Sequence, residues 1–333
     1  MKHLCIINPM AGQIKGRVHD VEETIRNFFY GNPRMNYSIH ITRWKRDASG
    51  YTLRYVNKAP EVVRVYAFGG GGTLFEVING VIGLPNVQVA YFPLGSRNDN
   101  LIAVFGNDQK EAFKSMKNLS LSPVITIDTI LAGNHHVVTS VLIGIETVAY
   151  QLGLELSERI KLPYNVCNFL AGVYYTIINP RIRRYRIEME DEEIDGEYAG
   201  VFIANASGKE LWSSDQDILF NDGFIDIYTI KPAPKNKIIN VLRDYQSGQY
   251  AKWPEYIAHY RCKKLRITSP TDMTISLDGE IFYDRELNFE IRSASLDFVC
   301  PVTIDEALLS RKPEERAVIK DFQLEDFLDG DLS

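Results

Sequence analysis

The residues with the strongest chemical signature are four consecutive glycines, residues 69–72, followed by Thr73 and Glu76. The apolar run 62–67 before them predicts a buried strand, and the apolar spacing within residues 74–81 predicts a helix. A strand, a glycine loop and a helix together present bare backbone N–H groups and a helix N-terminus to a phosphate. Because glycines also build ordinary turns, this stretch favours a phosphorylated ligand but is weak evidence when taken alone.

Three more polar segments follow predicted strands in the first third of the chain. They are Asn8-Pro9-Met10-Ala11-Gly12, Thr42 with Asp47-Ala48, and Pro93-Leu94-Gly95-Ser96-Arg97-Asn98-Asp99. Each of them alone fits a tight turn with a helix cap. In a parallel sheet, however, all such loops lie at the carboxyl edge, where ligands bind. Four loops that could each bind phosphate at one edge of the sheet therefore indicate a nucleotide-binding site more strongly than any single loop does.

Hydrophobic periodicity divides the chain into two parts. Before residue 122, strand and helix patterns alternate, which predicts an α/β domain with a parallel sheet; the expected strands are 4–7, 37–42, 62–67 and 87–92, and the expected helices are 18–29, 48–56 and 74–81. After it, strand patterns predominate and predict an antiparallel, sandwich-like β-rich domain; the expected strands are 124–132, 136–142, 184–189, 198–204, 224–230, 264–268, 273–277, 287–291 and 295–299, with helices at 147–159 and 165–178.

These patterns predict three segments of the chain. We expect a nucleotide-binding α/β domain at residues 1–122 and a β-rich domain at residues 123–305. The remaining segment, 306–333, is a tail whose last part, 321–333, is acidic and carries Phe322, Leu324, Phe327 and Leu328 at helical spacing. Those apolar residues favour docking of the tail on the first domain over fraying.

The composition fits an ordinary globular protein and argues against several classes. The 333 residues are 45% hydrophobic and 24% charged, with a net charge of −6, so nucleic acid is not an expected partner. The four cysteines are scattered, which argues against a zinc site and gives no disulfide framework. The longest apolar-rich stretch, 169–178, has about half of the ~20 residues that a membrane span needs. We therefore expect a cytoplasmic protein with no transmembrane segment.

The order of these segments resembles that of the diacylglycerol kinase catalytic domain family, which includes soluble bacterial lipid kinases and the sphingosine and ceramide kinases. The resemblance extends over residues 1–302 and includes two segments of the second domain. The family's Asp-Gly-x-x-Asp segment is similar to Asn221-Asp222-Gly223-Phe224-Ile225-Asp226, and its Asp-Gly-Glu segment is similar to Leu277-Asp278-Gly279-Glu280. It implies ATP-dependent phosphorylation of a diacylglycerol-like or sphingoid lipid, with peripheral contact at a membrane surface. The implied nucleotide site lies between the two domains and contains Asn8, Pro9, Met10, Ala11, Gly12, Thr42, Gly70, Gly71, Gly72, Thr73, Leu74, Phe75, Glu76 and Ser96.

The resemblance also implies catalytic carboxylates. Glu280 stands at the position of the family's general base, which would take the proton of the attacking hydroxyl. Asp278, two residues earlier, is a second candidate, and either Asp278 or Asp99 could supply a carboxylate that faces the metal. From the residues alone, Asp278-Gly279 between alternating runs predicts a hairpin turn, which is compatible with a tip that holds Glu280 over the cleft.

A Mg²⁺ site in the second domain is implied in the same way. Its ligands would be the side chain of Asp222 and the backbone carbonyls of Leu219 and Phe224. Hard oxygen ligands with one carboxylate, completed by water, suit Mg²⁺. The residues alone are equally compatible with an Asx turn at positions 221–223.

One departure from the family pattern concerns the glycine loop. The family has Gly-Gly-Asp-Gly-Thr, so Gly71 replaces an acidic residue; in addition, Phe75 stands where an Asn is usual and Ser96 replaces a Thr. Loss of one preorganised charged group at a phosphoryl centre costs ~3–4 kcal/mol, or about 10²–10³ in rate, by analogy with oxyanion donors. Since the backbone loop is retained, nucleotide binding need not be lost. We expect either a slow lipid kinase or a relative that has lost turnover.

Two other functions remain open from the sequence, an NAD-kinase-like enzyme, which shares the glycine loop, and a catalytically silent nucleotide-binding protein. A basic cluster at residues 181–186, with Lys231, Lys235 and Lys237, could meet anionic lipid headgroups or form a solvated strand face. The loop that carries Trp253 and Tyr256 could contact lipid or pack on the domain. The sequence also leaves open whether the chain forms a homodimer.

Overall fold

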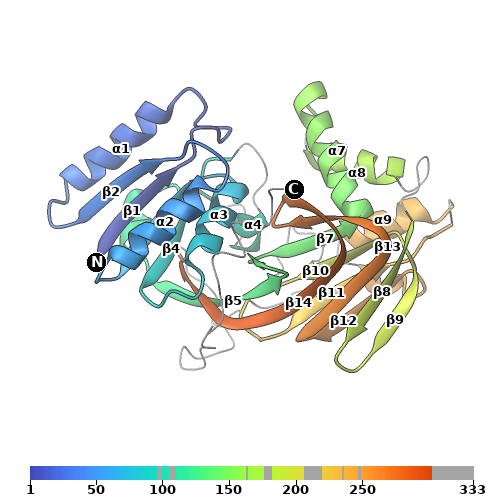
Figure 1. The fold of residues 1–333 in the computed structure, drawn as a ribbon. Helices are drawn as coiled ribbons and strands as arrows, with labels where there is room; N and C mark the ends of the chain where they lie inside the picture. The colour runs from blue at the N-terminus through green and yellow to red at the C-terminus, as the bar shows by residue number, and fades with distance from the viewer. Residues whose placement is uncertain are drawn as a thin grey trace.

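The computed structural model describes residues 1–95, 100–105, 110–162, 164–175, 182–205, 220–234, 236–246 and 249–301. Its strands form one sheet of fourteen strands that runs through two lobes (Figure 1). Along the main path of this sheet, the strand order is β12-β11-β10-β7-β13-β14-β4-β3-β1-β2, and β5, β6, β8 and β9 pair beside it.

The first lobe is an α/β unit. Its elements are β1 (Lys2–Ile7), α1 (Val18–Tyr30), β2 (Asn36–Ile41), α2 (Asp47–Lys58), β3 (Val63–Gly69), α3 (Gly71–Val81) and β4 (Val87–Pro93). The four strands are parallel, in the order β2-β1-β3-β4. Every residue of β3 is buried, as its apolar run predicts for a central strand of a parallel sheet. The predicted parallel sheet is confirmed.

The strand order fixes where a ligand can bind. The chain moves outward from β1 to β2 and then returns past β1 to β3, so the direction of winding reverses between β1 and β3. With right-handed crossovers, α1 covers one face of the sheet, and α2 and α3 cover the other; Figure 1 shows α1 apart from the α2–α3 pair. The crevice outside the carboxyl ends of β1 and β3 is the topological switch point, where open α/β sheets bind ligands.

The second lobe is built from antiparallel strands and a few helices. Short helices lead into it: α4 (Asn100–Phe105), α5 (Lys110–Phe113) and α6 (Met116–Leu121). Its strands are β5 (Val124–Ala132), β6 (His135–Val137), β7 (Ser140–Gly144), β8 (Arg183–Met189), β9 (Glu193–Tyr198), β10 (Gly200–Ala204), β11 (Ile225–Ile230), β12 (Ile257–Cys262), β13 (Lys264–Leu277) and β14 (Glu280–Val299). Its helices are α7 (Ile145–Ile160), α8 (Tyr164–Val173), α9 (Ile238–Gln246) and the short η3 (Tyr250–Lys252). The strand pairs within this lobe are antiparallel, as predicted.

Some strand predictions were wrong in extent. The strands expected at 264–268 and 273–277 are one strand, β13, and those expected at 287–291 and 295–299 belong to the 20-residue β14. The strand expected at 136–142 is divided between β6 and β7. Charged residues in the middle of the β13–β14 hairpin interrupt the hydrophobic pattern by which a strand is predicted. The backbone pairing of the two strands nevertheless continues past these residues, with one irregularity between Thr268 and Met273.

Strand β14 joins the two lobes. It pairs with β13 over much of its length, then with β5, and finally runs parallel to β4, where Phe298 lies opposite Val89. Leu296 and Phe298 are buried in the core of the first lobe, with residues of β3 and β4. The first lobe therefore includes residues from both ends of the described chain. The predicted tail, 306–333, lies outside the described residues.

Two expected properties of the whole chain can be compared with the structure. Among the described residues, no helix is long and apolar enough to cross a membrane. The four cysteines are all free and buried, and burial raises the pKa of the thiols of Cys5 and Cys262.

Candidate functional site

The glycine loop lies between β3 and α3, at the switch point. Gly70 is extended, and its carbonyl oxygen accepts hydrogen bonds from the N–H groups of Thr73 (3.0 Å) and Leu74 (3.2 Å). No side chain caps the N-terminus of α3, so its first N–H groups remain available to a ligand. A Cβ on Gly69 would collide with the side chain of Thr73. The loop thus needs glycine here because of close packing, and it presents the helix N-terminus that the sequence predicts.

Side-chain bonds hold the neighbouring loops against this one. Asn8, directly after β1, donates from Nδ2 to Oγ1 of Thr73 (3.0 Å) and accepts from the N–H of Met10 (2.9 Å). Gln13 donates to the carbonyl oxygens of Leu94 and Gly95. The loops after β1, β3 and β4 are therefore joined by hydrogen bonds at one edge of the sheet, and the segment with Thr42 and Ala48 is joined to Ile7 and Glu76.

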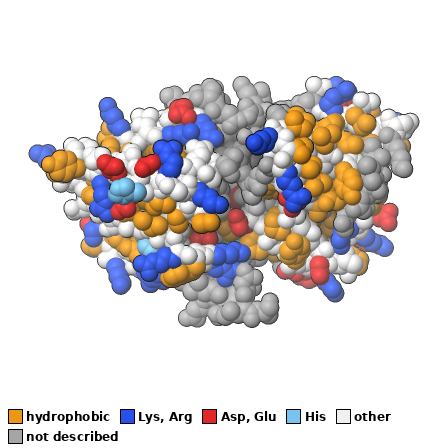
Figure 2. Space-filling model, turned by 90° about the horizontal axis from the view of Figure 1, so that it is seen from above, with side chains coloured by type: hydrophobic (Ala, Val, Ile, Leu, Met, Phe, Trp, Pro, Cys, Tyr) orange, Lys and Arg blue, Asp and Glu red, His pale blue; other side chains and the backbone are white. Residues whose placement is uncertain are grey.

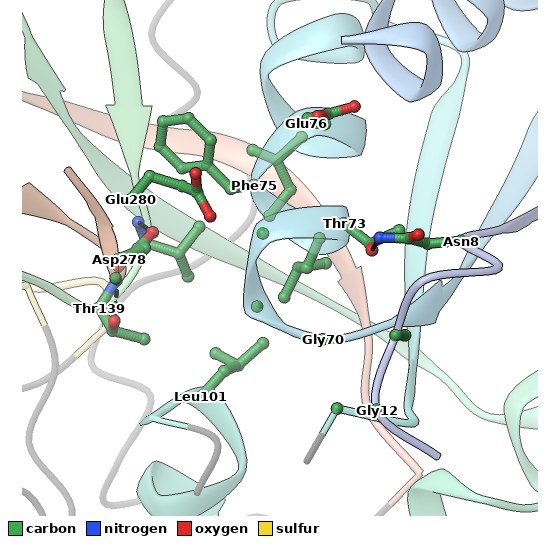
Figure 3. A pocket seen from close by; sticks show the side chains of 18 of the residues that line it. Asn8, Gly12, Gly70, Thr73, Phe75, Glu76, Leu101, Thr139, Asp278 and Glu280 are labelled. Carbon is green, nitrogen blue, oxygen red and sulfur yellow. Dashed lines mark hydrogen bonds between the residues drawn. The ribbon is translucent and has the colours of Figure 1, made fainter. Parts of the chain in front are cut away.

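The loops enclose a cavity of about 340 Å³ between the two lobes. It is lined by Asn8, Met10, Ala11, Gly12, Gly70, Gly71, Gly72, Thr73, Leu74, Phe75, Glu76, Ile78, Gly95, Leu101, Val138, Thr139, Tyr150, Asp278, Gly279 and Glu280 (Figure 3). Two of the predicted nucleotide residues, Pro9 and Thr42, are described but do not line it. The N–H of Thr42 instead bonds the carbonyl oxygen of Ile7 (2.9 Å). Ser96 and Asp99 lie outside the described residues.

Glu280 reaches the cavity from the opposite lobe. Asp278 and Gly279 have φ values of 48° and 95°, so they form the tight turn between β13 and β14 that an Asp-Gly pair favours. Glu280 follows this turn and points toward the first turn of α3 (Figure 3). A Cβ on Gly72 would lie 2.5 Å from its Oε1 atom. The carboxylate therefore occupies the space that the absent side chain of Gly72 leaves open.

Asp278 has a different environment. Its carboxylate accepts hydrogen bonds from the N–H groups of Val138 (2.7 Å), Thr139 (2.9 Å) and Ser140 (3.1 Å), and from Oγ1 of Thr139 (2.5 Å). Burial raises the pKa of this carboxyl group, and the four hydrogen bonds oppose that rise. Figure 3 shows Asp278 directed toward Thr139. This geometry fixes the turn before Glu280 and gives Asp278 the contacts of a positioning residue rather than those of a metal-facing carboxylate.

Glu76, in α3, is an acidic residue that lines the cavity on the side of the first lobe. Its carboxylate accepts from the N–H groups of Arg46 (2.9 Å) and Ala48 (3.3 Å), so it caps the start of α2. Burial raises its pKa, these two backbone hydrogen bonds lower it, and the charge of Glu280 adds a smaller rise. Burial is therefore the main cause of the raised pKa of Glu76.

Helix α3 is fixed between the lobes on several sides. Asn79 exchanges two hydrogen bonds with the backbone of His136 in β6: its Oδ1 accepts from the N–H at 2.7 Å, and its Nδ2 donates to the carbonyl oxygen at 3.0 Å. A Cβ on Gly80 would lie 2.6 Å from the backbone of Ser49, so α2 and α3 touch here without a side chain between them. Phe75 is buried in the core of the second lobe. These contacts hold the glycine loop and Glu280 in a fixed relation.

Several lining residues were not predicted. Thr139 lines the cavity directly before β7, Tyr150 lines it from α7, and Leu101 lines it from α4. No local signal marks them, because their role depends on contacts across more than a hundred residues, such as that between Thr139 and Asp278. Gly279, in contrast, belongs to the Asp-Gly-Glu segment and could have been included from the sequence.

Asp222, the one side-chain ligand of the Mg²⁺ site implied for the second domain, contacts other groups in the structure. The carboxylate of Asp222 forms a salt bridge with Nη2 of Arg261 and accepts from the N–H of Phe224 (3.0 Å). The same guanidinium bonds Asp226 through Nε (3.1 Å) and lies over the ring of Phe224, 4.7 Å from its centroid. Leu219, the other implied ligand, lies outside the described residues.

The basic residues that could meet lipid headgroups are largely paired. In β8, Arg184 bonds Asp195 (2.7 Å) and Arg186 bonds Glu193 (3.0 Å). Strand β8 therefore presents the solvated, salt-bridged face that was the alternative interpretation. Lys237 forms a salt bridge with Glu255 (3.6 Å), and Trp253 and Tyr256 pack partly buried against a hydrophobic cluster of the second lobe. Arg181 and Lys235 lie outside the described residues.

Comparison with known proteins identifies the two halves of the chain. The profile of the diacylglycerol kinase catalytic domain matches residues 2–130, and that of the YegS C-terminal NAD kinase beta sandwich-like domain matches residues 139–300. A protein of Shewanella frigidimarina named "Probable lipid kinase YegS-like" is 24% identical over 265 residues, which cover 75% of this chain and 81% of the relative.

Solved structures support the same fold. The crystal structure of a diacylglycerol kinase from Bacillus anthracis covers 92% of this chain and 98% of that one, with a TM-score of 0.63 and 19% identity. A second solved chain from this organism gives a TM-score of 0.69 at 21% identity, with the same coverage. The fold and the two profile matches are those of two-domain proteins similar to lipid kinases. Residues 2–130 match the model of the diacylglycerol kinase catalytic domain, and residues 139–300 match that of the YegS C-terminal domain.

Proposed function

We propose that the chain transfers the γ-phosphoryl group of ATP to the hydroxyl of a diacylglycerol-like or sphingoid lipid. The observation that carries this proposal is the placement of Glu280 across one cavity from the open N-terminus of α3. A phosphate bound at that helix N-terminus and a hydroxyl beside the carboxylate would be neighbours, as phosphoryl transfer requires. A cytoplasmic protein that visits the inner face of the membrane would meet such a lipid.

The proposed reaction uses few groups. The glycine loop and the first N–H groups of α3 bind the phosphates of ATP, which arrives with Mg²⁺ as its counterion. The lipid oxygen bonds to the γ-phosphorus while the bond from that phosphorus to the β–γ bridging oxygen breaks, and ADP leaves. The proton of the hydroxyl passes to Glu280. Asp278 keeps Glu280 in place through the bonds that it accepts from residues 138–140.

A silent nucleotide-binding protein is the second candidate, and one observation favours it. Gly71 puts no carboxylate at the mouth of the glycine loop, and Asp278, which could have supplied one, bonds the backbone instead. A lipid kinase with this site would turn over slowly. The NAD-kinase-like alternative is not favoured, because the relatives are named as lipid kinases.

The test compares the wild type with Glu280→Gln in an assay of ADP release with Mg²⁺ and ATP. Diacylglycerol, sphingosine and NAD serve as separate acceptors, and the phosphorylated product is identified by mass. We expect lipid-dependent ADP release that falls about 10²–10⁴-fold in Glu280→Gln, the usual contribution of a general base. ATP affinity should change little, because the phosphate-binding backbone is intact.

Asp284→Asn is the matched control, since it makes the same change of charge on β14 at an exposed position four residues further along. Its activity should equal that of the wild type. ATP binding without turnover of any acceptor would support the silent protein, and phosphorylation of NAD alone would refute the lipid kinase.

A further inference from the structure

Three strands of the sheet leave one edge of their backbone unpaired. Among the described strands of six residues or more, β2, β9 and β12 pair with a neighbour on one side only. Strand β9 carries three acidic residues and β12 carries Arg261, and charges on an exposed edge oppose pairing with another chain. Strand β2 contains no Asp, Glu, Lys, Arg or Pro, and its register with β1 is continuous over all six residues. The outer edge of β2 therefore has none of these protections.

The backbone groups of this outer edge can be assigned residue by residue. The N–H of Thr42, directly after β2, bonds the carbonyl oxygen of Ile7 in β1. Alternate residues of a strand direct their N–H and C=O groups to the same side, so every second residue back from Thr42 also faces β1. The residues between them, Tyr37, Ile39 and Ile41, direct their backbone groups outward, where no strand in the described part of the chain pairs with them.

We propose that β2 pairs in antiparallel fashion with β2 of a second copy of the chain, about a two-fold axis at Ile39. In this register Ile39 lies opposite Ile39 of the other copy, and Tyr37 lies opposite Ile41. Each of these pairs exchanges two backbone hydrogen bonds. The pairs of Tyr37 with Ile41 join an aromatic and a β-branched side chain, which stabilises antiparallel sheets. Because the two-fold axis uses both free edges, assembly stops at the dimer.

The side chains of the edge fit such a partner. Tyr37, Ile39 and Ile41 are half-buried and pack against the core of the first lobe, and the same side chains of a second copy would cover the rest of their apolar surface. Exposed aromatic residues also flank β2: Tyr30, at the end of α1, is 89% exposed, and Trp44, just past β2, is 65% exposed. Antiparallel pairing places the start of one β2 beside the end of the other, so Tyr30 of one copy comes toward Trp44 of the other.

An extended peptide of another protein is a less suitable occupant of this edge. Strand addition can bind such a peptide, but specificity then requires pockets for its side chains. A second copy brings a strand of the same length without charges, so no like charges meet along the edge. It also brings its own Tyr30 and Trp44 to the two ends of the interface, where a single strand would leave both residues exposed.

The position of β2 keeps the proposed interface away from the candidate site. In Figure 1, β2 and α1 lie at the left end of the molecule, and the second lobe lies on the right. Figure 2 shows the same left end from above, with hydrophobic side chains among charged ones of both signs. Because the cavity lies between the two lobes, a second copy at this end leaves the cavity accessible.

The experiment measures the mass of the full chain by analytical ultracentrifugation, without nucleotide or lipid. One strand edge is smaller than a standard interface of about 800 Å² per partner, so we expect a dimer at about 100 µM that dissociates on dilution. Ile39→Pro removes both hydrogen bonds of the central pair but keeps the bonds to β1, since Pro is tolerated where the N–H faces outward. Its dissociation constant should rise at least about tenfold. Ile39→Val, which retains the N–H, is the matched control and should remain a dimer.

Cross-linking tests the register, and it does not depend on the folding of Ile39→Pro. The Cα atoms of a hydrogen-bonded antiparallel pair lie ~5.5 Å apart, within the range that a disulfide spans. The four native cysteines are buried, so Ile39→Cys should form a disulfide-linked dimer under mild oxidation through the new thiol. Leu121→Cys is the control, because Leu121 is 68% exposed on α6, outside the proposed interface, and this variant should remain a monomer on a non-reducing gel.

Three results would overturn the proposal. They are a wild-type monomer at about 100 µM, a dimer whose dissociation constant is unchanged in a folded Ile39→Pro variant, and equal cross-linking of Ile39→Cys and Leu121→Cys. Thermal melting shows which variants are folded. The measurements need neither ATP nor turnover, so their outcome does not depend on the proposed function.

Discussion

Replacing Gly71 by Asp tests most directly what limits this site. Gly71 is the first residue of α3, and a Cβ there would meet only the carbonyl oxygen of Asp278, at 3.7 Å, which is an ordinary contact distance. Its φ angle is not positive, so a side chain introduces no backbone strain. An acidic residue in the first turn of a helix also adds ~0.3–1 kcal/mol through the helix dipole. Gly71→Asp should therefore fold with unchanged or slightly higher stability.

The expected gain in activity follows from the charge alone. A preorganised charged group in a water-excluded phosphoryl site contributes ~3–4 kcal/mol to the transition state, which corresponds to about 10²–10³ in rate. Position 71 lies on the wall of the cavity, beside the N-terminus where the phosphates would bind. The new carboxylate would face the Mg²⁺ that accompanies ATP. We expect kcat for lipid phosphorylation to rise by about this factor.

The assay is ATP-dependent phosphorylation of diacylglycerol in mixed micelles with Mg²⁺. Gly71→Asn is the first control, because it has nearly the same shape without the charge and should give no gain. Gly72→Asp is the second, because it places the same carboxylate one residue further on. A Cβ at that position lies 2.5 Å from Oε1 of Glu280, so this variant should displace the base and lose activity.

One outcome would refute this reasoning. If Gly71→Asp melts at the same temperature as the wild type and binds ATP, but phosphorylates lipid no faster than Gly71→Asn does, then an absent carboxylate is not what limits turnover. The electrostatic account of the glycine loop would then have to be abandoned.

Two further predictions concern Arg261 and Glu76. If Arg261 takes the place of a cation beside Asp222, the melting temperature of the nucleotide-free wild type should be the same in Mg²⁺ and in EDTA. Arg261→Ala should lower the melting temperature in EDTA by ~2–4 °C, because a half-exposed ion pair contributes about 1 kcal/mol. Mg²⁺ should restore part of this loss. Scanning fluorimetry measures both, and stabilisation of the wild type by Mg²⁺ alone would contradict the assignment. Burial raises the pKa of Glu76 above its ordinary value of 4.5. Above pH 4.5 the folded chain therefore binds more protons than the unfolded chain does. The free energy of unfolding of the protein then falls as the pH rises. The destabilisation by Glu76→Gln should therefore shrink from pH 4.5 upward in urea titrations, and a destabilisation that grows with pH would show that the carboxylate is favoured in the fold.

The parts of the fold that depend on local pattern were predictable from the sequence. Strand β3 is apolar and is followed by the glycines, and α1 has a clear helical period, so both were placed within one or two residues. Strand β12 was not predicted, because its sequence, IAHYRC, does not alternate strictly between polar and apolar residues. Helix α9 was also not predicted, although Ile238, Val241 and Tyr245 lie at helical spacing within it.

The candidate site divides along a similar line. The motifs predicted the glycine loop, Asn8 and Glu280 as members of one cavity, because parallel strands bring their loops to one edge and a hairpin tip can reach across. The role of Asp278 was not predictable, because its hydrogen-bond partners lie about 140 residues earlier in the chain. The pairing of Asp222 with Arg261 depends on the contact of β11's leading turn with β12 and has no local signal.

The return of β14 to the sheet of the first lobe has a consequence for biosynthesis. Phe298 completes a core whose other members come mostly from the first third of the polypeptide. While the ribosome is still making the middle of the chain, the first lobe lacks its last strand, and the outer edge of β4 is unpaired. We therefore expect a fragment cut after residue 130 to aggregate when expressed alone, although a family profile ends there, and the nascent half to depend on chaperones until translation has passed residue 299.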